Sequence, residues 1–599
     1  MKNFITSMLG ALVALVIFAT AAFVLFLGFI GAIIAMGQQK KVPELTSGSY
    51  LVFDLSANIT DAPPPVDFDG FAGGGTDVLQ LRSVTRALRY AARDSKIRGV
   101  LLLGNLTPRL TGSGFAALRE IRGALADFRA SGKPVLAYLD YATTRDFYLA
   151  SAANEVAIDP YGMIIMPGLA TQPVFYAGAF EKYGIGIQVT RVGKYKSYVE
   201  PFTRTDMSPE NREQLQKLLD DLWGTLIADI GRSRGVTAES IQATVDAEGF
   251  IRPAAAARAH LVDRTAYRDE IVEQLKKETG VTSPTESFKQ IPLGLYVKTA
   301  MHPPVPSGRG QVAVVYAEGD IVDGEGDATE VGGVRFAREI RKLREDASVK
   351  AIVLRVNSPG GSVTASEAIQ RELRLARKAK PVVVSMGSYA ASGGYWISAY
   401  GDRIFAEPTT ITGSIGVFGI QFNVQKLANE HGFTFDMVKT GKYADAITIA
   451  RPLTDDEMAV VQRRVDWIYS QFVAKVAEGR KLKAPFVEEI AQGRVWSGAE
   501  AKKLGLVDEI GGLNDAIRYA GAQARLPAAF RVVEYPRSKN LSEALAEMFG
   551  RFAPATLHMK ATGIVGEIVE GLESAFARVR ALNDPQGVYA RMPMDIAIR

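Results

Sequence analysis

The chain contains no cysteine and only four histidines among its 599 residues. The absence of cysteine excludes disulfides, thiolate metal sites and a cysteine nucleophile. None of the four histidines lies in a Gly-rich or Ser-rich segment, and no H-E-x-x-H motif occurs. A zinc hydrolase is therefore not expected, and any hydrolytic chemistry has to use other side chains.

The chain also lacks a strong charge of either sign, because 70 basic and 65 acidic residues leave a net charge of +5. No block of basic residues with interleaved aromatics is present, so nucleic-acid binding is not expected. The proportions of hydrophobic (47%) and charged (23%) residues are those of an ordinary globular protein. At this length two or more large domains are expected.

Charged residues are absent between Asn3 and Gln39, and the stretch Met8–Met36 is almost wholly apolar. About 20 apolar residues are enough for a helix to cross a bilayer. The apolar core of a cleavable signal peptide is much shorter, at roughly 7–15 residues. We therefore expect residues 1–45 to hold an uncleaved transmembrane anchor. Lysines flank both ends of the apolar run, so the positive-inside rule leaves its orientation open.

The rest of the chain repeats itself. Residues 94–100 (DSKIRGV) resemble residues 346–352 (DASVKAI), and matching segments continue in the same order after each of them. In both copies short β-branched runs alternate with amphipathic helical runs, which predicts α/β domains with mainly parallel strands. We expect domains at 46–301 and 302–540, the second opening with a Pro/Gly-rich boundary. Residues 541–599 match nothing else in the chain and are expected to form a helical tail.

The two copies differ at a serine. Where the second copy reads YAASGGYW, the first reads YATTRDFY, so that Ser392 falls opposite Arg145 and Gly393 opposite Asp146. If Ser392 served only to let two elements pack closely, a small residue would be expected in both copies. The serine and the glycines after it instead suggest a nucleophile on a tight turn, where a backbone N–H can approach a substrate.

A second difference is the pair of adjacent glycines, Gly360 and Gly361, in NSPGGSVTASE (357–367), which the first copy lacks. A Gly-Gly turn at the end of a strand can expose N–H groups toward an oxyanion. The alternative is a tight strand-to-helix turn. Taken alone, the segment is better explained by this alternative.

The third difference is a lysine in the first copy. Lys194 aligns with Lys442 and is shared, whereas Lys196 aligns with Ala444. A serine nucleophile needs a neighbouring base, and a Ser–Lys pair is a known variant of the Ser–His–Asp arrangement. Lysine can act in this way if burial lowers its pKa from about 10.4 toward 7–8. The alternative is that Lys196 is a solvated surface lysine, as most lysines are.

The second copy holds a further Gly/Ser segment, ITGSIGVFG (411–419). The hydroxyl of Ser414 could hold the lysine amine in place. A glycine-rich turn between two strands explains the segment at least as well.

The family resemblance of the chain rests on four segments: YKSYVEPF, VNSPGGSVTASE, AASGGYWIS and TGSIGVFG. In this order they resemble the long, duplicated form of the signal peptide peptidase A (protease IV) family of Ser–Lys serine proteases. The resemblance implies a ClpP/crotonase-type fold, a repeated ββα spiral, present twice in the chain behind the N-terminal transmembrane helix.

The resemblance also assigns roles to residues. It implies that Ser392 is the nucleophile, that Lys196 is the general base and that Ser414 orients Lys196. The backbone N–H groups of Gly361 and Gly393 would form the oxyanion hole. Neither a metal nor another cofactor is required. Because one chain carries both halves of the pair, we expect Lys196 to reach Ser392 of its own chain.

The family degrades signal peptides that remain in the membrane, which implies apolar and unfolded peptides as substrates. It further implies a homotetramer on the bacterial inner membrane, anchored by a single span, with the catalytic domains in the periplasm. Two alternatives are a crotonase-type acyl-CoA enzyme, which needs no Ser–Lys pair, and a non-enzymatic membrane scaffold, which needs no serine.

Overall fold

The computed structural model describes residues 18, 45–64, 66–67, 78–104, 114–301, 310–537, 539–540 and 582–592. Apart from residue 18, the apolar stretch expected to anchor the chain lies outside these residues, and so do residues 302–309 of the expected boundary at 302–310. No helix within the described part of the chain is both long and apolar enough to cross a membrane.

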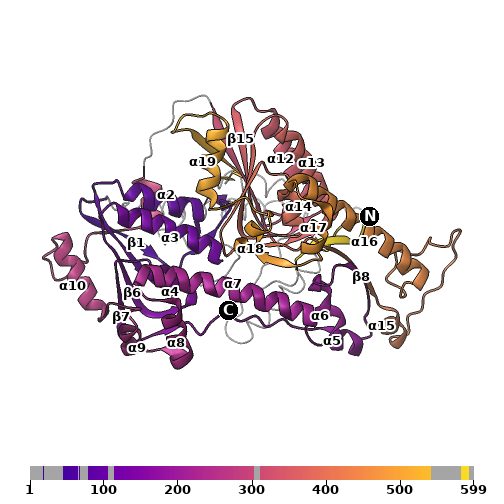
Figure 1. Cartoon of the computed structure of the whole chain (residues 1–599), viewed down its shortest axis with the longest axis horizontal. Helices are drawn as coiled ribbons and strands as arrows, with labels where there is room; N and C mark the ends of the chain where they lie inside the picture. The colour runs from indigo at the N-terminus through magenta and orange to yellow at the C-terminus, as the bar shows by residue number, and fades with distance from the viewer. Residues whose placement is uncertain are drawn as a thin grey trace, which may run out of the picture.

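The first repeat forms a seven-stranded sheet in the order β10-β7-β6-β5-β1-β11, with β9 added beside β7 (Figure 1). All the pairings are parallel except that of β7 with β9. The strands are β1 (Ser49–Asp54), β5 (Ile97–Leu103), β6 (Val135–Thr143), β7 (Glu155–Ile165), β9 (Phe250–Ile251), β10 (Arg264–Thr265) and β11 (Gln290–Pro292).

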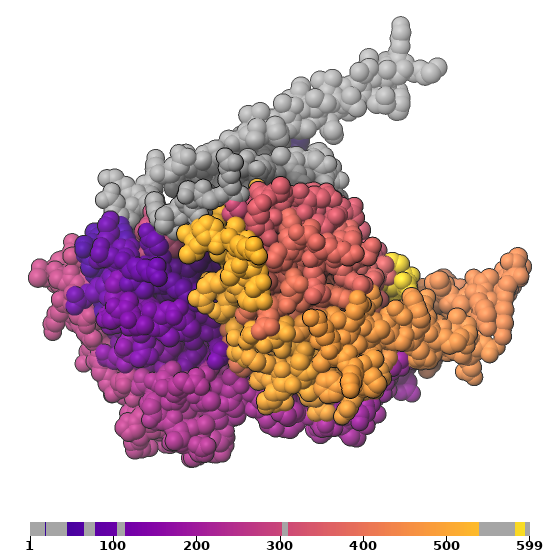
Figure 2. All heavy atoms as spheres, turned by 45° about the horizontal axis from the view of Figure 1, so that its top comes forward, coloured from indigo at the N-terminus to yellow at the C-terminus, as the bar shows by residue number. Residues whose placement is uncertain are grey.

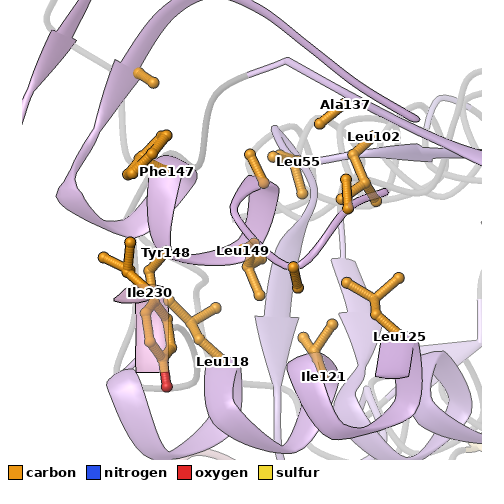
Figure 3. Packing of buried hydrophobic residues seen from close by; sticks show 14 of the residues in the cluster. Leu55, Leu102, Leu118, Ile121, Leu125, Ala137, Phe147, Tyr148, Leu149 and Ile230 are labelled. Carbon is orange, nitrogen blue, oxygen red and sulfur yellow. The ribbon is translucent and has the colours of Figure 1, made fainter. Parts of the chain in front are cut away.

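Helices cover both faces of this sheet. On one face, Leu118, Ile121 and Leu125 of α3 point toward Leu102 and Ala137 of the sheet (Figure 3). Their spacing of three and four residues places them on one side of a helix, which explains why this segment is helical and packs here. The helices of the first repeat are α2 (Leu81–Ala91), α3 (Phe115–Ala130), α4 (Thr144–Ala150), α5 (Ala177–Lys182), η2 (Ser197–Val199), α6 (Glu200–Thr203), α7 (Pro209–Arg234), α8 (Ala238–Glu248), α9 (Pro253–Arg258), α10 (Arg268–Thr279) and α11 (Leu293–Thr299).

The second repeat forms an eight-stranded sheet whose central path β23-β12-β15-β17-β18-β22 has the same order as β11-β1-β5-β6-β7-β10 in the first. The duplication predicted from the sequence is therefore confirmed at the level of strand order. Its strands are β12 (Gln311–Glu318), β15 (Val349–Ser358), β17 (Val382–Ala391), β18 (Arg403–Ala406), β19 (Ile411–Gly413), β21 (Val495–Ser497), β22 (Glu509–Ile510) and β23 (Arg531–Tyr535).

All the pairings of this sheet are parallel except that of β19 with β21. Strand β12 shows why its parallel strands are covered on both faces. Ala313 and Val315 face the core under α12, α13 and α16, whereas Val312 and Val314 face α19 on the opposite side. A strand buried on both faces reads as a continuous apolar run, and β12 is such a run. The helices of the second repeat are α12 (Gly333–Glu345), α13 (Val363–Arg377), α14 (Gly393–Ser398), α15 (Gln425–Glu430), α16 (Asp455–Arg480), α17 (Ala484–Ile490), α18 (Gly498–Lys503) and α19 (Leu513–Gln523).

A third sheet joins the two repeats, in the order β14-β13-β16-β25-β20-β8. Strand β8 comes from the first repeat and pairs antiparallel along the whole of β20 from the second. These strands are β8 (Gly186–Val192), β13 (Ile321–Val322), β14 (Val331–Gly332), β16 (Gly360–Ser362), β20 (Val417–Asn423) and β25 (Val588–Arg591). Two short pairs complete the sheets: β2 (Asn58–Thr60) with β4 (Val78–Gln80), and β3 (Val66–Asp67) with β24 (Lys539–Asn540).

Strand β25 corrects the expectation of a wholly helical tail. It lies between β16 and β20, antiparallel to both. Val588 and Tyr589 favour a strand, but four residues are too few to show a period in the sequence. The rest of the tail lies outside the described residues.

Helix α7 leads away from the segment that carries Lys196. The Ser208 hydroxyl accepts a hydrogen bond from the Asn211 N–H, Pro209 occupies the first turn, and Gly235 ends the helix with φ of 68°. Each of these is a standard signal for a helix start or stop. Figure 1 shows α7 running across the lower half of the molecule, between α6 and α4.

Buried charges hold the two repeats against each other. Arg355 of β15 forms ion pairs with Asp61 at 2.8 Å and with Glu120 at 2.7 Å, both from the first repeat. The Arg355 side chain is wholly buried. These ion pairs join the two repeats. Loss of one partner would leave the other charge buried without a counter-charge, which would lower the free energy of unfolding.

Candidate active site

Lys196 of the first repeat and Ser392 of the second lie side by side, with 2.7 Å between Lys196 Nζ and Ser392 Oγ. Ser392 lies between strand β17 and helix α14, and Lys196 directly precedes the short helix η2. Lys194, two residues earlier, is exposed, and its amine lies over the ring of Tyr195 instead. Of the two lysines, only the one that is absent from the second copy reaches the serine.

The backbone at Ser392 is strained. It has φ of 57° and ψ of −110°, and its N–H donates to the Gly413 carbonyl at 2.8 Å. Residues other than glycine rarely adopt such a conformation, which persists only where the surrounding structure enforces it. The turn between β17 and α14 thereby directs the serine side chain toward Lys196.

Burial disfavours the charged form of the lysine. Lys196 has no exposed surface, and this burial lowers its pKa well below the usual lysine value. Its amine also lies 3.0 Å from Ser414 Oγ and donates to the Ser414 carbonyl at 3.1 Å. A buried lysine held in the neutral form has a lone pair that can accept the proton of the serine hydroxyl.

The glycines of the site bring two backbone N–H groups together. A Cβ on Gly361 would lie 2.0 Å from the Ile321 carbonyl oxygen, and one on Gly393 would lie 3.0 Å from the Gly361 nitrogen. Gly361 also has φ of 154°, which disfavours any other residue. Gly393 is the first residue of α14, where N–H groups have no acceptor within the helix. The Gly361 nitrogen thus lies close to Gly393, the residue that follows Ser392.

Sequence reasoning missed Gln214, a buried residue of α7. Its side-chain amide donates to the Tyr195 carbonyl at 2.9 Å and accepts from the Val495 N–H at 3.2 Å. The carbonyl of Arg494, the residue before Val495, accepts from the N–H of Ser414 at 2.7 Å. Gln214 therefore connects the segment that carries Lys196 to the segment that holds Ser414. A glutamine within a long helix gives no sequence signal of such a role.

A second missed group lies behind the lysine. Glu200 is buried and accepts hydrogen bonds from the Ser208 N–H and the Asn211 amide, both at 3.1 Å. Asn211 in turn accepts from the Ser197 hydroxyl at 2.8 Å. These contacts fix the backbone that follows Lys196. Among the described residues, no three His, Asp or Glu side chains are grouped so that they could hold a metal ion.

Comparison with protein families gives two matches. The model of peptidase family S49 matches residues 127–282 and again 374–526, once in each repeat. The Clp protease model matches residues 330–412, so the repeats are tandem ClpP-like domains.

Individual relatives cover most of the chain. "Protease 4" of Salmonella typhi is 36% identical over 575 residues, which cover 91% of this chain and 90% of the relative. "Serine protease SPPA, chloroplastic" of Arabidopsis thaliana is 32% identical over 540 residues, covering 88% of this chain and 77% of the relative. Among solved structures, a point mutant of ClpP1 from Listeria monocytogenes is 16% identical, with a TM-score of 0.24. The match covers 34% of this chain and 94% of the ClpP1 chain.

The family match therefore covers both repeats, and the relatives extend it over nearly the whole chain. The chain belongs to peptidase family S49 and is a serine peptidase.

Proposed function

We propose that the chain is an endopeptidase that uses Ser392 as its nucleophile and Lys196 as its general base. The observation that carries this proposal is the 2.7 Å contact between Lys196 Nζ and Ser392 Oγ inside a fully buried site. Neutral Lys196 accepts the hydroxyl proton while Ser392 Oγ attacks the peptide carbonyl carbon. The N–H groups of Gly361 and Gly393 donate to the oxyanion of the tetrahedral intermediate.

The same lysine completes the reaction. Its ammonium returns the proton to the leaving amine, the C–N bond breaks, and an acyl-enzyme remains on Ser392. Lys196 then removes a proton from the water that hydrolyses the ester. Ser414 orients the lysine throughout, because its hydroxyl and carbonyl both lie within hydrogen-bonding distance of the amine.

We propose apolar peptides, in particular signal peptides left after protein export, as the substrates. Apolar side chains gather beside the site and come from both repeats and the tail: Tyr198, Val199, Phe418, Ile420 and Tyr589. Together with the apolar N-terminal run, they favour a protease on the bacterial inner membrane. Residues 46–301 and 302–540 would be its two periplasmic domains.

An exposed arm of the second repeat, residues 438–449, supports assembly into a homotetramer. Val438 is 97% exposed and Ile447 100% exposed, and the arm that contains them extends with α15 away from the body (Figure 2). The corresponding first-repeat segment, 191–202, packs against the second repeat and delivers Lys196. By the symmetry of the repeats, the arm would pack against the first repeat of a neighbouring chain. Repeated head to tail, a contact whose rotation closes forms a ring, as a homotetramer of this kind requires.

The test uses the full chain in detergent and a fluorogenic peptide that carries an apolar signal sequence. Ser392→Ala and Lys196→Ala should each abolish cleavage, whereas Lys194→Ala, the matched control, should cleave as the parent does. Equal cleavage by Ser392→Ala and the parent would remove Ser392 from the mechanism. A folded parent that cleaves no peptide would favour the scaffold alternative.

A further inference from the structure

Arg494 lies where the two repeats meet beside the active site, and its guanidinium contacts both of them. The guanidinium carbon lies 4.7 Å from the centre of the Tyr195 ring, which belongs to the first repeat, and 4.6 Å from that of the Trp496 ring in the second. Arginine stacks on aromatic faces through its charge and its planar shape. One cation therefore joins an aromatic ring of each repeat.

Polar contacts of Arg494 fix the same arrangement. Its Nη1 donates to the Tyr195 hydroxyl at 3.1 Å and forms an ion pair with Glu213 of α7 at 3.0 Å. The Tyr195 hydroxyl in turn donates to Glu213 at 3.1 Å. Tyr195 is buried and the Arg494 side chain is 19% exposed, so solvent screens their contact less than that of a surface pair. We call Arg494, Tyr195, Trp496 and Glu213 the arginine clamp.

The backbone of Arg494 contacts the residue that orients the lysine. Its carbonyl accepts from the Ser414 N–H at 2.7 Å. Ser414 has φ of 49°, which residues other than glycine rarely adopt, so its neighbours have to hold it in place. The Ser414 hydroxyl lies 3.0 Å from the Lys196 amine. Arg494 thus supports Ser414 through its carbonyl and the neighbour of Lys196 through its side chain.

The segment before Arg494 packs directly against the lysine backbone. The Tyr195 N–H donates to the Gln492 carbonyl at 2.9 Å. A Cβ on Gly493 would lie 2.7 Å from the Cβ of Lys196, so a side chain there would push the two backbones apart. The position of Tyr195 on this segment therefore sets the point from which the Lys196 side chain reaches Ser392.

Comparison of the two copies separates the arginine clamp from the scaffold that both copies share. The segment GRVW, which begins at Gly493, matches GFIR in the first copy. Arg494 therefore stands opposite Phe250, and Trp496 opposite Arg252. The glycine is common to both copies, but the arginine and the tryptophan occur at these positions only in the copy that carries the serine.

The partner on α7 follows the same pattern. Helices α7 and α16 each have 26 residues, and when they are aligned at their first residues Glu213 stands opposite Ala459. Tyr195 itself is shared, because Tyr443 occupies its place in the second copy. Tyr443 is 44% exposed, whereas Tyr195 is 7% exposed. The shared tyrosine is thus buried in the copy where a lysine has to be held beside a serine.

We propose that Arg494 is a positioning residue, which holds Tyr195 and thereby keeps Lys196 beside Ser392 and out of contact with water. The proposal rests on the proposed function of Lys196 and Ser392. Arg494 acts through Tyr195 and Ser414 and does not touch the reacting atoms. Loss of its side chain should let the Lys196 amine move away from the serine and let water reach it.

Arg494→Ala in the full chain tests this role. We expect kcat on an apolar signal-peptide substrate to fall by about 10- to 100-fold with little change in KM, because a small displacement of a reacting group is costly. The midpoint of the kcat/KM profile against pH should rise by about one unit, because water at Lys196 favours its charged form. Arg252→Ala, at an exposed position of the matching segment in the first copy, is the control and should equal the parent.

Two conservative variants keep the test decisive if Arg494→Ala folds poorly. Arg494→Lys keeps the charge but lacks the planar group that lies over the two rings. Tyr195→Phe keeps the ring but loses the hydroxyl that contacts Arg494 and Glu213. Each should shift the pH midpoint in the same direction as Arg494→Ala, by a smaller amount. Midpoints equal to that of the parent in the folded variants would overturn the proposal, whatever their stability.

A readout that needs no peptide cleavage separates this proposal from the proposed function. Lysines are acetylated with acetic anhydride at about pH 10.4, where half of the solvated lysines are neutral, and the products are followed by mass spectrometry. Lys196 should react slowly in the parent and faster in Arg494→Ala, whereas the exposed Lys194 should react equally in both. Faster labelling in a chain whose Ser392→Ala variant still cleaves peptides would support the clamp but refute the nucleophile. Equal labelling of Lys196 in both chains would refute the clamp.

Discussion

Lys196 Nζ lies 2.7 Å from Ser392 Oγ although 196 residues separate the two in the chain. Each residue belongs to a different copy of one fold, and neither has an equivalent in the other copy. The first repeat reaches across the second through β8 and places its lysine beside the serine. Because of the duplication, one chain supplies both residues of the pair. The two meet within that chain, which agrees with the expectation from the sequence.

Replacing Lys196 by methionine should lower kcat by at least about 100-fold, since a general base contributes roughly 10²–10⁴ to the rate. Methionine keeps most of the volume but has no lone pair of sufficient basicity. Steady-state kinetics on an apolar peptide would measure the loss. Lys194→Met, at the exposed position two residues earlier, should change kcat by less than about twofold. If Lys194→Met were the inactive variant, the lysine would be wrongly assigned.

The rate should also depend on pH in a defined direction. Burial lowers the pKa of Lys196 well below the usual lysine value, so the amine loses its proton at a lower pH than a solvated lysine does. Activity should therefore rise as the pH rises through this lowered pKa and then level off. A profile of kcat/KM against pH measures the midpoint. A midpoint near that of a free lysine would contradict a buried neutral base.

Stability should follow the same titration. Between the lowered pKa of Lys196 and about 10.4, the unfolded chain binds one proton more than the folded chain. The free energy of unfolding should therefore increase with pH across this window, by about 1.4 kcal/mol per pH unit from this residue. Urea unfolding of the parent and of Lys196→Met at a series of pH values isolates the contribution. The difference between them should shrink as the pH rises, and a constant difference would refute the linkage.

Gln214 should behave as a positioning residue rather than a catalytic one. Gln214→Ala removes the donor to the Tyr195 carbonyl and the acceptor of the Val495 N–H together. We expect kcat to fall by about 10- to 100-fold with little change in KM, because a small displacement of a reacting group is costly. Gln214→Glu keeps the acceptor and should recover part of the rate. A variant with normal kcat and reduced stability would assign Gln214 a structural role only.

The sequence was sufficient to predict the repeats, the parallel strands and the residues that meet at the site. It was sufficient because β-branched runs, helical periods and glycine pairs are local patterns, and because the two copies could be compared. Gln214 was missed because its importance lies in two backbone partners, one of which is distant in the chain. Strand β25 was missed because its stability as a strand comes from β16 and β20 and not from its own four residues.

The contact between the repeats gives the last prediction. Arg355→Met should lower the free energy of unfolding by about 3–5 kcal/mol, because Asp61 and Glu120 would remain buried without their counter-charge. Adding Asp61→Asn and Glu120→Gln to Arg355→Met removes the stranded charges and should restore much of the stability. Chemical denaturation of the parent, the single variant and the triple variant measures both effects. A single variant as stable as the parent would mean that the ion pairs contribute nothing to joining the repeats. Because Lys196 and Ser392 come from different repeats, activity should be lost at lower denaturant concentration in the single variant than in the parent.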